Sequence, residues 1–201
     1  MKFTKIPEDT FQTIQLNAGI LLDDFTPSTQ TMGNLLGATT GGIQLTCTPE
    51  FSDFGEDIDS CPKNTKELMH LDNWTVTMSG TFVTISADLA KRLVSAADAT
   101  ISTGLITPRN DLAQEDFMDM WWILDYSDIN EGPKAGFVAI HLINGLSTGG
   151  FKIQSGDNSK GQFAFEFTGH YSIAEQDKVP FELYVKRDTS SNSGGGGNST
   201  P

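Results

Sequence analysis

The chain has 201 residues, a length that suits one domain of ordinary size and can bury a core without disulfides or metals. It carries 26 acidic and 13 basic side chains, for a formal net charge of -13. Proteins that bind nucleic acid neutralise phosphates with clustered Lys and Arg, so this charge argues against a nucleic-acid-binding protein. It fits a surface that must not adhere to DNA, and it equally fits simple solubility.

From its composition we expect neither a signal peptide nor a membrane-spanning stretch in this sequence. Its first residues lack the apolar core of a signal peptide, and the longest apolar run, 120–124, is far shorter than a bilayer requires. We therefore expect a protein made and kept in the cytosol, with no membrane partner. Residues 188–201 are rich in Gly, Ser and Asn, which predicts a flexible tail after a single domain over 1–187.

Alternation of apolar and polar side chains predicts half-buried strands. The apolar positions of the four clearest segments are Ile43, Leu45 and Cys47; Trp74, Val76 and Met78; Phe163, Phe165 and Phe167; and Val179, Phe181, Leu183 and Val185. In the last segment Pro180 has no N–H to donate, so we expect it at a strand start or on an edge.

Two central segments differ from this pattern. Segment 137–143 is apolar on both faces, and segment 117–126 is apolar on one face and carries Trp121 and Ile123 between Asp119 and Asp125 on the other. A strand of this kind needs cover on both sides. A helix or a neighbouring subunit could supply the second layer.

One helix is expected, beginning after Ser86 as N-cap with Asp88 in its first turn. Leu89, Leu93 and Ala97 form a stripe at helical spacing, which predicts a helix that fades near residue 99. Together these segments predict a mainly β fold, a β-sandwich or rolled barrel with one packed α-helix.

The acidic residues concentrate in two stretches, 50–72 and 111–131, which account for nearly all of the net charge. We interpret both stretches as solvated loops or surface walls, without buried ion pairs.

Two loops resemble binding motifs without completing them. A phosphate loop would need Lys and Ser or Thr after Gly37-Ala-Thr-Thr-Gly-Gly42, where Ile43 follows, so a tight bend before a strand is favoured. Asp53, Asp57 and Asp59 alternate as in a calcium loop. Gly55 takes one ligand position and no closing glutamate follows, so an incidental acidic loop is favoured.

No other group predicts chemistry. His70, His141 and His170 lack ligand spacing, which predicts no metal site; we expect His141 to be a hydrogen-bonded core imidazole and His170 a turn residue. Cys47 is expected to be a free buried thiol, while Cys61 is ambiguous. We therefore assign no catalytic, cofactor-binding or metal residue and expect no enzyme, although a glycosidase-like acid pair stays open.

A series of short motifs, taken in order, resembles the major tail tube proteins of long-tailed bacteriophages and prophages. The likeness spans most of residues 19–185, and the tail lies outside it. The motifs are Leu-Gly-Ala-Thr-Thr-Gly-Gly-Ile at 36–43, Phe-Gly-Glu-Asp-Ile-Asp at 54–59, the approach to Trp74 over 63–74, Ser-Gly-Thr-Phe-Val-Thr at 79–84, the helix end Ala96-Ala-Asp98, Met-Trp-Trp-Ile-Leu-Asp-Tyr-Ser at 120–127, Ala-Ile-His-Leu at 139–142, Phe-Glu-Phe-Thr-Gly-His-Tyr-Ser at 165–172 and Val-Pro-Phe-Glu-Leu-Tyr-Val at 179–185.

The resemblance implies a structural virion protein. Such proteins form sixfold rings that stack into a tube, assembled in the cytoplasm of the bacterial host, through which DNA passes without specific binding. The implied partners are copies of the chain itself and tape-measure, tail-tip or baseplate, and tail-terminator proteins. By the same analogy, residues 48–72 are the candidate for contact between rings.

Other classes stay open. A monomeric β-sandwich could bind carbohydrate through Trp74, Trp121 or Trp122 and the acidic loops. Each tryptophan falls in an alternating segment, however, and is more simply a core or interface residue. A secretion-system or gene-transfer-particle tube would share the fold and most of the physics.

Overall fold

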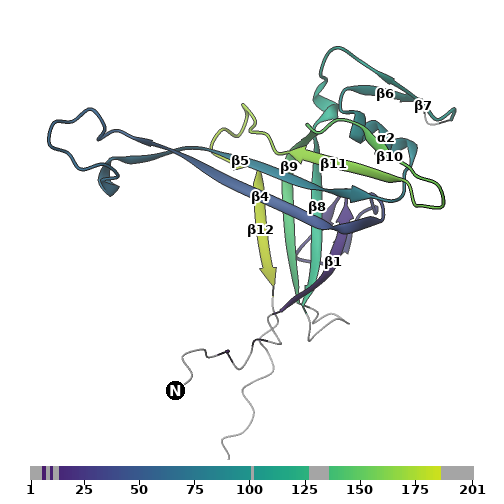
Figure 1. Cartoon of the computed structure of the whole chain (residues 1–201), viewed down its shortest axis with the longest axis horizontal. Helices are drawn as coiled ribbons and strands as arrows, with labels where there is room; N and C mark the ends of the chain where they lie inside the picture. Colours follow the sequence, from purple (N-terminus) through teal and green to yellow (C-terminus); the bar gives the residue numbers. More distant parts are fainter. Residues whose placement is uncertain (1–5, 8–9, 11–13, 101, 127–135, 187–201) are drawn as a thin grey trace, which may run out of the picture.

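The computed structural model describes residues 6–7, 10, 14–100, 102–126 and 136–186, and in it two antiparallel sheets cross (Figure 1). The first sheet has the order β1 (Gln15–Leu22), β8 (Met118–Tyr126), β9 (Phe137–Ser147) and β12 (Phe181–Lys186). The second has the order β4 (Thr39–Asp53), β5 (Met69–Phe82), β11 (Gln162–Thr168) and β10 (Lys152–Gln154). Pairing of β9 with β11 joins them, and this confirms the predicted mainly β fold.

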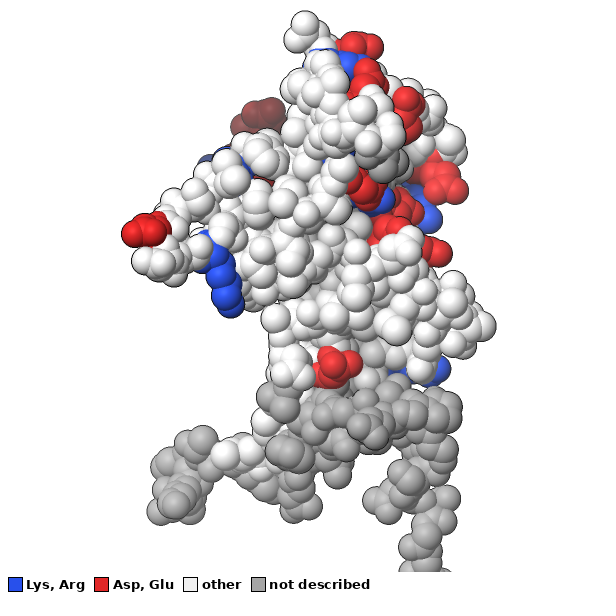
Figure 2. Space-filling model, turned by 90° about the vertical axis from the view of Figure 1, so that its right-hand side faces the viewer, with Lys and Arg blue, Asp and Glu red and all other residues white. Residues whose placement is uncertain are grey.

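Smaller elements lie around the two sheets. The hairpins β2 (Phe25–Thr26) with β3 (Thr31–Met32), and β6 (Ala97–Thr100) with β7 (Leu105–Pro108), form separate two-stranded sheets. The helix α2 (Ala87–Val94) lies beside β6 and β7, and the 3-10 turns η1 (Lys66–Leu68) and η2 (Gln114–Asp116) precede β5 and β8. On the side that carries α2, β6 and β7, charged side chains gather in the upper part, and the middle of the body is largely uncharged (Figure 2).

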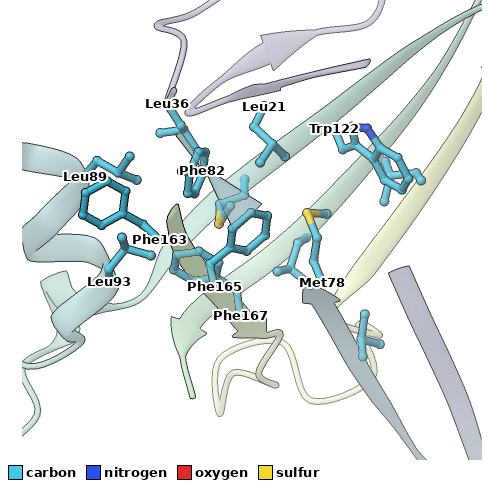
Figure 3. Packing of buried hydrophobic residues seen from close by; sticks show 14 of the residues in the cluster. Leu21, Leu36, Met78, Phe82, Leu89, Leu93, Trp122, Phe163, Phe165 and Phe167 are labelled. Atoms are coloured by element: carbon cyan, nitrogen blue, oxygen red, sulfur yellow. The ribbon is translucent and has the colours of Figure 1, made fainter. Parts of the chain in front are cut away.

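The main core lies between the two sheets and α2. Phe163, Phe165 and Phe167 point inward from β11 at every second position, as predicted, and pack with Phe82 and Met78 of β5. Leu89 and Leu93 reach the same core from α2 and point toward these phenylalanines (Figure 3).

A second, smaller core covers the other face of the first sheet. It contains Trp121 and Ile123 of β8 and Phe137 and Ala139 of β9, and Phe25 closes it from the β2–β3 hairpin. The Phe25 ring meets those of Trp121 and Phe137 edge-on, with centroids 5.7 and 5.3 Å apart. The apolar character of both faces of 117–126 and 137–143 is therefore satisfied largely within the chain.

The helix begins where predicted and ends earlier. Ser86 Oγ accepts the N–H of Leu89 at 3.1 Å, which confirms the N-cap. The predicted end near residue 99 is wrong, because Ser95 takes a φ of 80° that breaks the helix and Ala97 begins β6. Ala97 is nevertheless buried. The three residues of the predicted stripe thus all lie in the interior, Leu89 and Leu93 from α2 and Ala97 from β6.

β1 was not predicted, and its pattern is hidden by a bulge between Leu16 and Ile20. The bulge lets the Trp122 indole N–H donate to the Ala18 carbonyl at 2.8 Å. At Gly19, with a φ of 71°, an added Cβ would lie 2.2 Å from the Ile123 carbonyl oxygen, so only glycine fits.

The predicted inward face of the last strand is wrong at two positions. Leu183 and Val185 are 57% and 63% exposed, although they share a face with the buried Ile140 and the half-buried Val138 through the β9 pairing. The second sheet crosses β12 near its start, so the far end of this edge strand has no cover (Figure 1). Pro180 lies fully buried just before β12, which confirms its expected place.

The acidic stretch 111–131 contains a buried ion pair, which corrects the prediction of solvated acids alone. Asp116, fully buried, accepts two hydrogen bonds from Arg109 Nη2 at 2.7 and 2.8 Å and one from the Ala113 N–H at 2.8 Å. Burial works against the charge of Arg109, but Asp116 and Asp98 outweigh it and raise the pKa of Arg109. The pair ties the end of β7 to the turn before β8.

We predict that Asp116→Ala lowers the midpoint of thermal unfolding by roughly 5–10 °C, because the half-buried Arg109 guanidinium loses one of its two carboxylate partners and the Ala113 N–H loses its acceptor. The matched control is Asp111→Ala, which removes an exposed carboxylate from the same stretch. Calorimetry of the three proteins checks this, and equal midpoints for the two variants would contradict it.

Candidate functional site

The β4–β5 hairpin is the element that departs most from a compact body. Its strands of 15 and 14 residues pair from Thr39 with Phe82 to Asp53 with Met69, and the hairpin reaches far beyond the crossing sheets (Figure 1). The prediction that 50–72 is a loop is therefore wrong at both ends. Only residues 54–68 connect the strands, and η1 lies within them.

An apolar stripe runs along the uncovered part of the hairpin. Over the body, Leu45 and Cys47 of β4 and Val76 of β5 face the core. Farther out, Phe51 pairs with Leu71, and Met69, which pairs with Asp53, lies two pairs beyond on the same face. We name Phe51, Met69 and Leu71 the hairpin stripe; they are 57%, 37% and 43% exposed.

A bulge at Asp72 produces this stripe. Glu50 pairs with Asn73 and Phe51 with Leu71, so Asp72 has no partner in the ladder, and its carboxylate accepts the Ser52 hydroxyl at 2.6 Å. The extra residue shifts the alternation of β5 by one position. Leu71 and Met69 consequently join Phe51 on the face that Cys47 presents to the core.

Asp53 organises the connection between the strands. Its two carboxylate oxygens accept the backbone N–H groups of Asn64 at 2.9 Å and Gly55 at 2.8 Å. These hydrogen bonds lower the pKa of Asp53. The prediction that these acids have no structural role is therefore wrong for Asp53, which closes the turn. Asp57 and Asp59 are exposed. Among the described residues, no group of three or more His, Cys, Asp or Glu could hold a metal ion.

The glycines of 37–42 also have a conformational role. Gly41 and Gly42 have φ angles of 74° and 86° and form a bulge between Thr40 and Ile43. The predicted bend thus lies inside β4, because pairing with β5 already begins at Thr39. A residue with a side chain would be strained at either glycine.

His141 is the centre of a hydrogen-bonded network, as expected for a core imidazole. Its Nε2 lies 3.0 Å from Asp119 Oδ2 and its Nδ1 3.4 Å from Glu182 Oε2, and the ring stacks on Trp121 with centroids 4.0 Å apart. Tyr184 donates to the same Glu182 oxygen at 2.8 Å. The network joins β8, β9 and β12 across the first sheet.

The other expected residues lie apart from one another. His170 follows β11 as predicted and meets Phe117 edge-on at the wall of an open cavity of about 500 Å³. His70 lies on the hairpin beside Phe54.

Cys47 and Cys61 are both free and half-buried, and burial raises the pKa of the Cys47 thiol. Trp121 and Trp122 are buried and Trp74 is half-buried against Phe181, so the described tryptophans form no exposed platform.

Comparison with known proteins adds a distant likeness. No protein-family model matches the sequence, and no curated protein matches it significantly. A chain in the virion of a native gene transfer agent particle superposes with a TM-score of 0.42 at 7% identity, covering 84% of this chain and 96% of that one. A chain in the tail of an empty particle of this kind, solved with C6 symmetry, gives 0.39 at 10% identity and the same coverage. At these values the likeness extends no conclusion about assembly or function to this chain.

One further observation concerns membranes. Within the described part of the chain, no helix is long and apolar enough to cross a bilayer.

We predict that Asp53→Ala loosens residues 54–68 while the body stays folded, because the Gly55 and Asn64 N–H groups lose their acceptor. Hydrogen exchange should rise in this segment and stay unchanged in β9 and β11. Asp57→Ala is the control, since Asp57 is exposed on the same loop. Unchanged protection of 54–68 in the Asp53 variant would refute the role.

We also predict an acid-sensitive contribution from the His141 network. The hydrogen bond with His141 lowers the pKa of Asp119 below its ordinary 3.8, and the hydrogen bond from Tyr184 lowers the pKa of Glu182 below its ordinary 4.5. Groups with depressed folded pKa values stabilise the protein above their ordinary values, and this stabilisation is lost as the pH falls through the folded values.

Urea unfolding of wild type and Asp119→Asn as a function of pH tests this. The wild type should be more stable at pH 7, and the difference should shrink as the pH falls below about 4. Asp157→Asn, an exposed change in the β10–β11 turn, is the control. A difference that stays constant with pH would contradict the assignment.

Proposed function

We propose that this chain is the tail tube subunit of a phage-like particle, which joins copies of itself into sixfold rings that stack into a tube for DNA. The order of sequence motifs suggests this class, and the observation that carries the proposal is the exposed hairpin stripe. A two-stranded hairpin that leaves the body gains little stability by itself. Burial of the apolar side chains along it by another molecule would stabilise both the hairpin and the contact.

The edges of both sheets support association with further copies. Among the described residues, β4 pairs only with β5 along its length, and β12 pairs only with β9. Natural monomers protect long edges with lysine, proline or bulges. β4 contains no lysine, and Pro49 and the bulge at Gly41 and Gly42 interrupt only part of its edge. An open edge on each of the two sheets favours head-to-tail contacts between copies, which close into a ring when the rotation per copy is suitable.

Such a tube requires several partners. The chain would contact copies of itself through the hairpin and the sheet edges, and tape-measure, tail-tip or baseplate and tail-terminator proteins at the tube ends. Its location would be the virion tail, after assembly in the bacterial cytoplasm. The proposal assigns no catalytic residue, cofactor or metal.

The carbohydrate-binding alternative is weakened by the burial of the tryptophans. Sugar rings stack on exposed aromatic faces, whereas Trp121 is covered by Phe25 and His141, and Trp122 lies in the main core. The tube proposal uses surfaces that are exposed.

Electron microscopy of the purified protein at high concentration tests the proposal. Wild type should form rings or tubes about 10 nm wide. Phe51→Ser with Leu71→Ser should leave a folded protein that forms few or no long tubes, because the stripe no longer gains by burial. Protein that stays monomeric at every concentration, and is absent from virus-like particles, would overturn the proposal.

The matched control for the hairpin is Leu112→Ser, which removes an equally exposed leucine from a loop outside the hairpin. Tubes should form normally with this variant. Normal tubes from the Phe51 and Leu71 double variant would refute the hairpin contact while leaving the tube itself intact.

A further inference from the structure

We infer that the β10–β11 hairpin is a docking surface, and that its partner is the tip of the β4–β5 hairpin of a second copy. This contact rests on the proposed function, to which it adds the surface that receives the tip. Two sets of exposed side chains carry it, one at each end of the second sheet. Both sets contain apolar side chains, and their free charges are opposite.

The tip of the β4–β5 hairpin presents apolar and acidic side chains together. Phe54 and Ile58 are exposed over more than half of their surface. Asp57 and Asp59, on either side of Ile58, are exposed as well, and neither forms an ion pair with a described residue. We name Phe54, Asp57, Ile58 and Asp59 the acidic tip.

The lysines of the same connection do not neutralise this pair of aspartates. Residues 54–68 contain four acidic and two basic side chains. Lys63 lies 3.5 Å from Glu56, and Lys66 lies 3.5 Å from Glu67. The excess of negative charge therefore falls on the two aspartates of the acidic tip, which are available to a partner.

The β10–β11 hairpin presents the complementary set. Phe151 and Ile153 are exposed apolar side chains on and beside β10. Lys152 and Lys160 are exposed, and within the described residues neither has an acidic partner. We name these four residues the basic hairpin, in which Asp157 is the one acid between residues 151 and 162. Such a surface fits an acidic partner that brings apolar side chains of its own.

A hollow in the β10–β11 turn gives a carboxylate a place to enter. An open cavity of about 290 Å³ lies there, and the residues that line it include Lys160, Ser155, Ser159, Gln154 and Gln162. Ammonium, hydroxyl and amide groups can all donate hydrogen bonds to a carboxylate. The cavity therefore suits an aspartate of the acidic tip.

Few other cations in the described part of the chain are available to the tip. Three of them already lie in ion pairs with acids of their own copy: Arg92, Arg109 and Lys178. Lys186 lies over the ring of Phe137. Lys91 of α2 has no ion pair among the described residues, but it is half-buried. The exposed lysines without a partner thus gather on the basic hairpin.

The register places the two surfaces at opposite ends of the second sheet. Phe163, just after the β10–β11 turn, pairs with Phe82 where the pairing of β4 with β5 begins. The tip lies beyond the other end, past the pair of Asp53 with Met69 (Figure 1). A contact between opposite ends joins copies head to tail, so it extends a stack in one direction. Opposite charges also set that direction, because two acidic tips repel each other.

Charge reversal in two complementary variants tests this contact. One variant carries Asp57→Lys with Asp59→Lys, and the other carries Lys152→Glu with Lys160→Glu. Each alone should fold and form rings but lose long tubes in electron micrographs, because its tip and its basic hairpin then carry the same sign of charge. An equimolar mixture should form long tubes, since each tip meets a hairpin of opposite charge on the other variant.

Long tubes from either variant alone, or no long tubes from the mixture, would overturn the contact. Lys91→Glu is the matched control, since it reverses another cation without an ion pair among the described residues, and it should form tubes as the wild type does. Wild type that forms neither rings nor tubes counts against the proposed function instead.

Disulfide cross-linking gives a second test, in a background with Cys47→Ala and Cys61→Ser. Mild oxidation of tubes that carry Ile58→Cys with Ile153→Cys should give a ladder of linked chains beyond the dimer, because each copy then joins two neighbours. Ile58→Cys with Thr103→Cys, exposed in the β6–β7 turn, is the control and should give no such ladder. Tubes without a ladder from the first pair, or an equal ladder from the control, would overturn the contact.

Discussion

The structure depends on the β4–β5 hairpin being longer than the hydrophobic core that it covers. The phenylalanines of β11 and the inward side chains of β4 and β5 bury a core against the first sheet and α2. Burial of this kind is the main stabilising term in a fold. The core ends well before the hairpin does. The inward face of the hairpin is therefore buried over the body and exposed to solvent at Phe51 and Leu71. The proposed contacts between copies follow from that difference.

The sequence could predict the elements in which periodicity is regular. Phe163, Phe165 and Phe167 alternate without interruption, and Ser86 caps α2 as its side chain suggests. Prediction failed where one residue interrupts the period. The bulges at residues 17–19 and at Asp72 hid β1 and shortened the expected hairpin, because a shifted alternation looks like a loop.

Two other features depend on tertiary structure that local patterns do not contain. Asp116 lies in an acidic stretch, and only the fold brings Arg109 within hydrogen-bonding distance of it. Leu183 and Val185 alternate as core residues do, but the crossing angle of the sheets decides where cover ends. For the candidate site, the resemblance pointed to the segment 48–72. The face on which its apolar side chains gather could be found only from the pairing register of β4 and β5.

The number of residues in the hairpin also sets how far its tip lies from the body. A strand advances about 3.3 Å per residue, so the 15 residues of β4 span roughly 50 Å from the first pair to the turn. Any partner engaged at the tip is held at a separation fixed by residue count and by the twist that the bulge adds. If copies stack through the hairpin as proposed, inserting or removing a pair of residues in each strand would change the distance between stacked copies in steps of about 7 Å, leaving the core of each copy untouched.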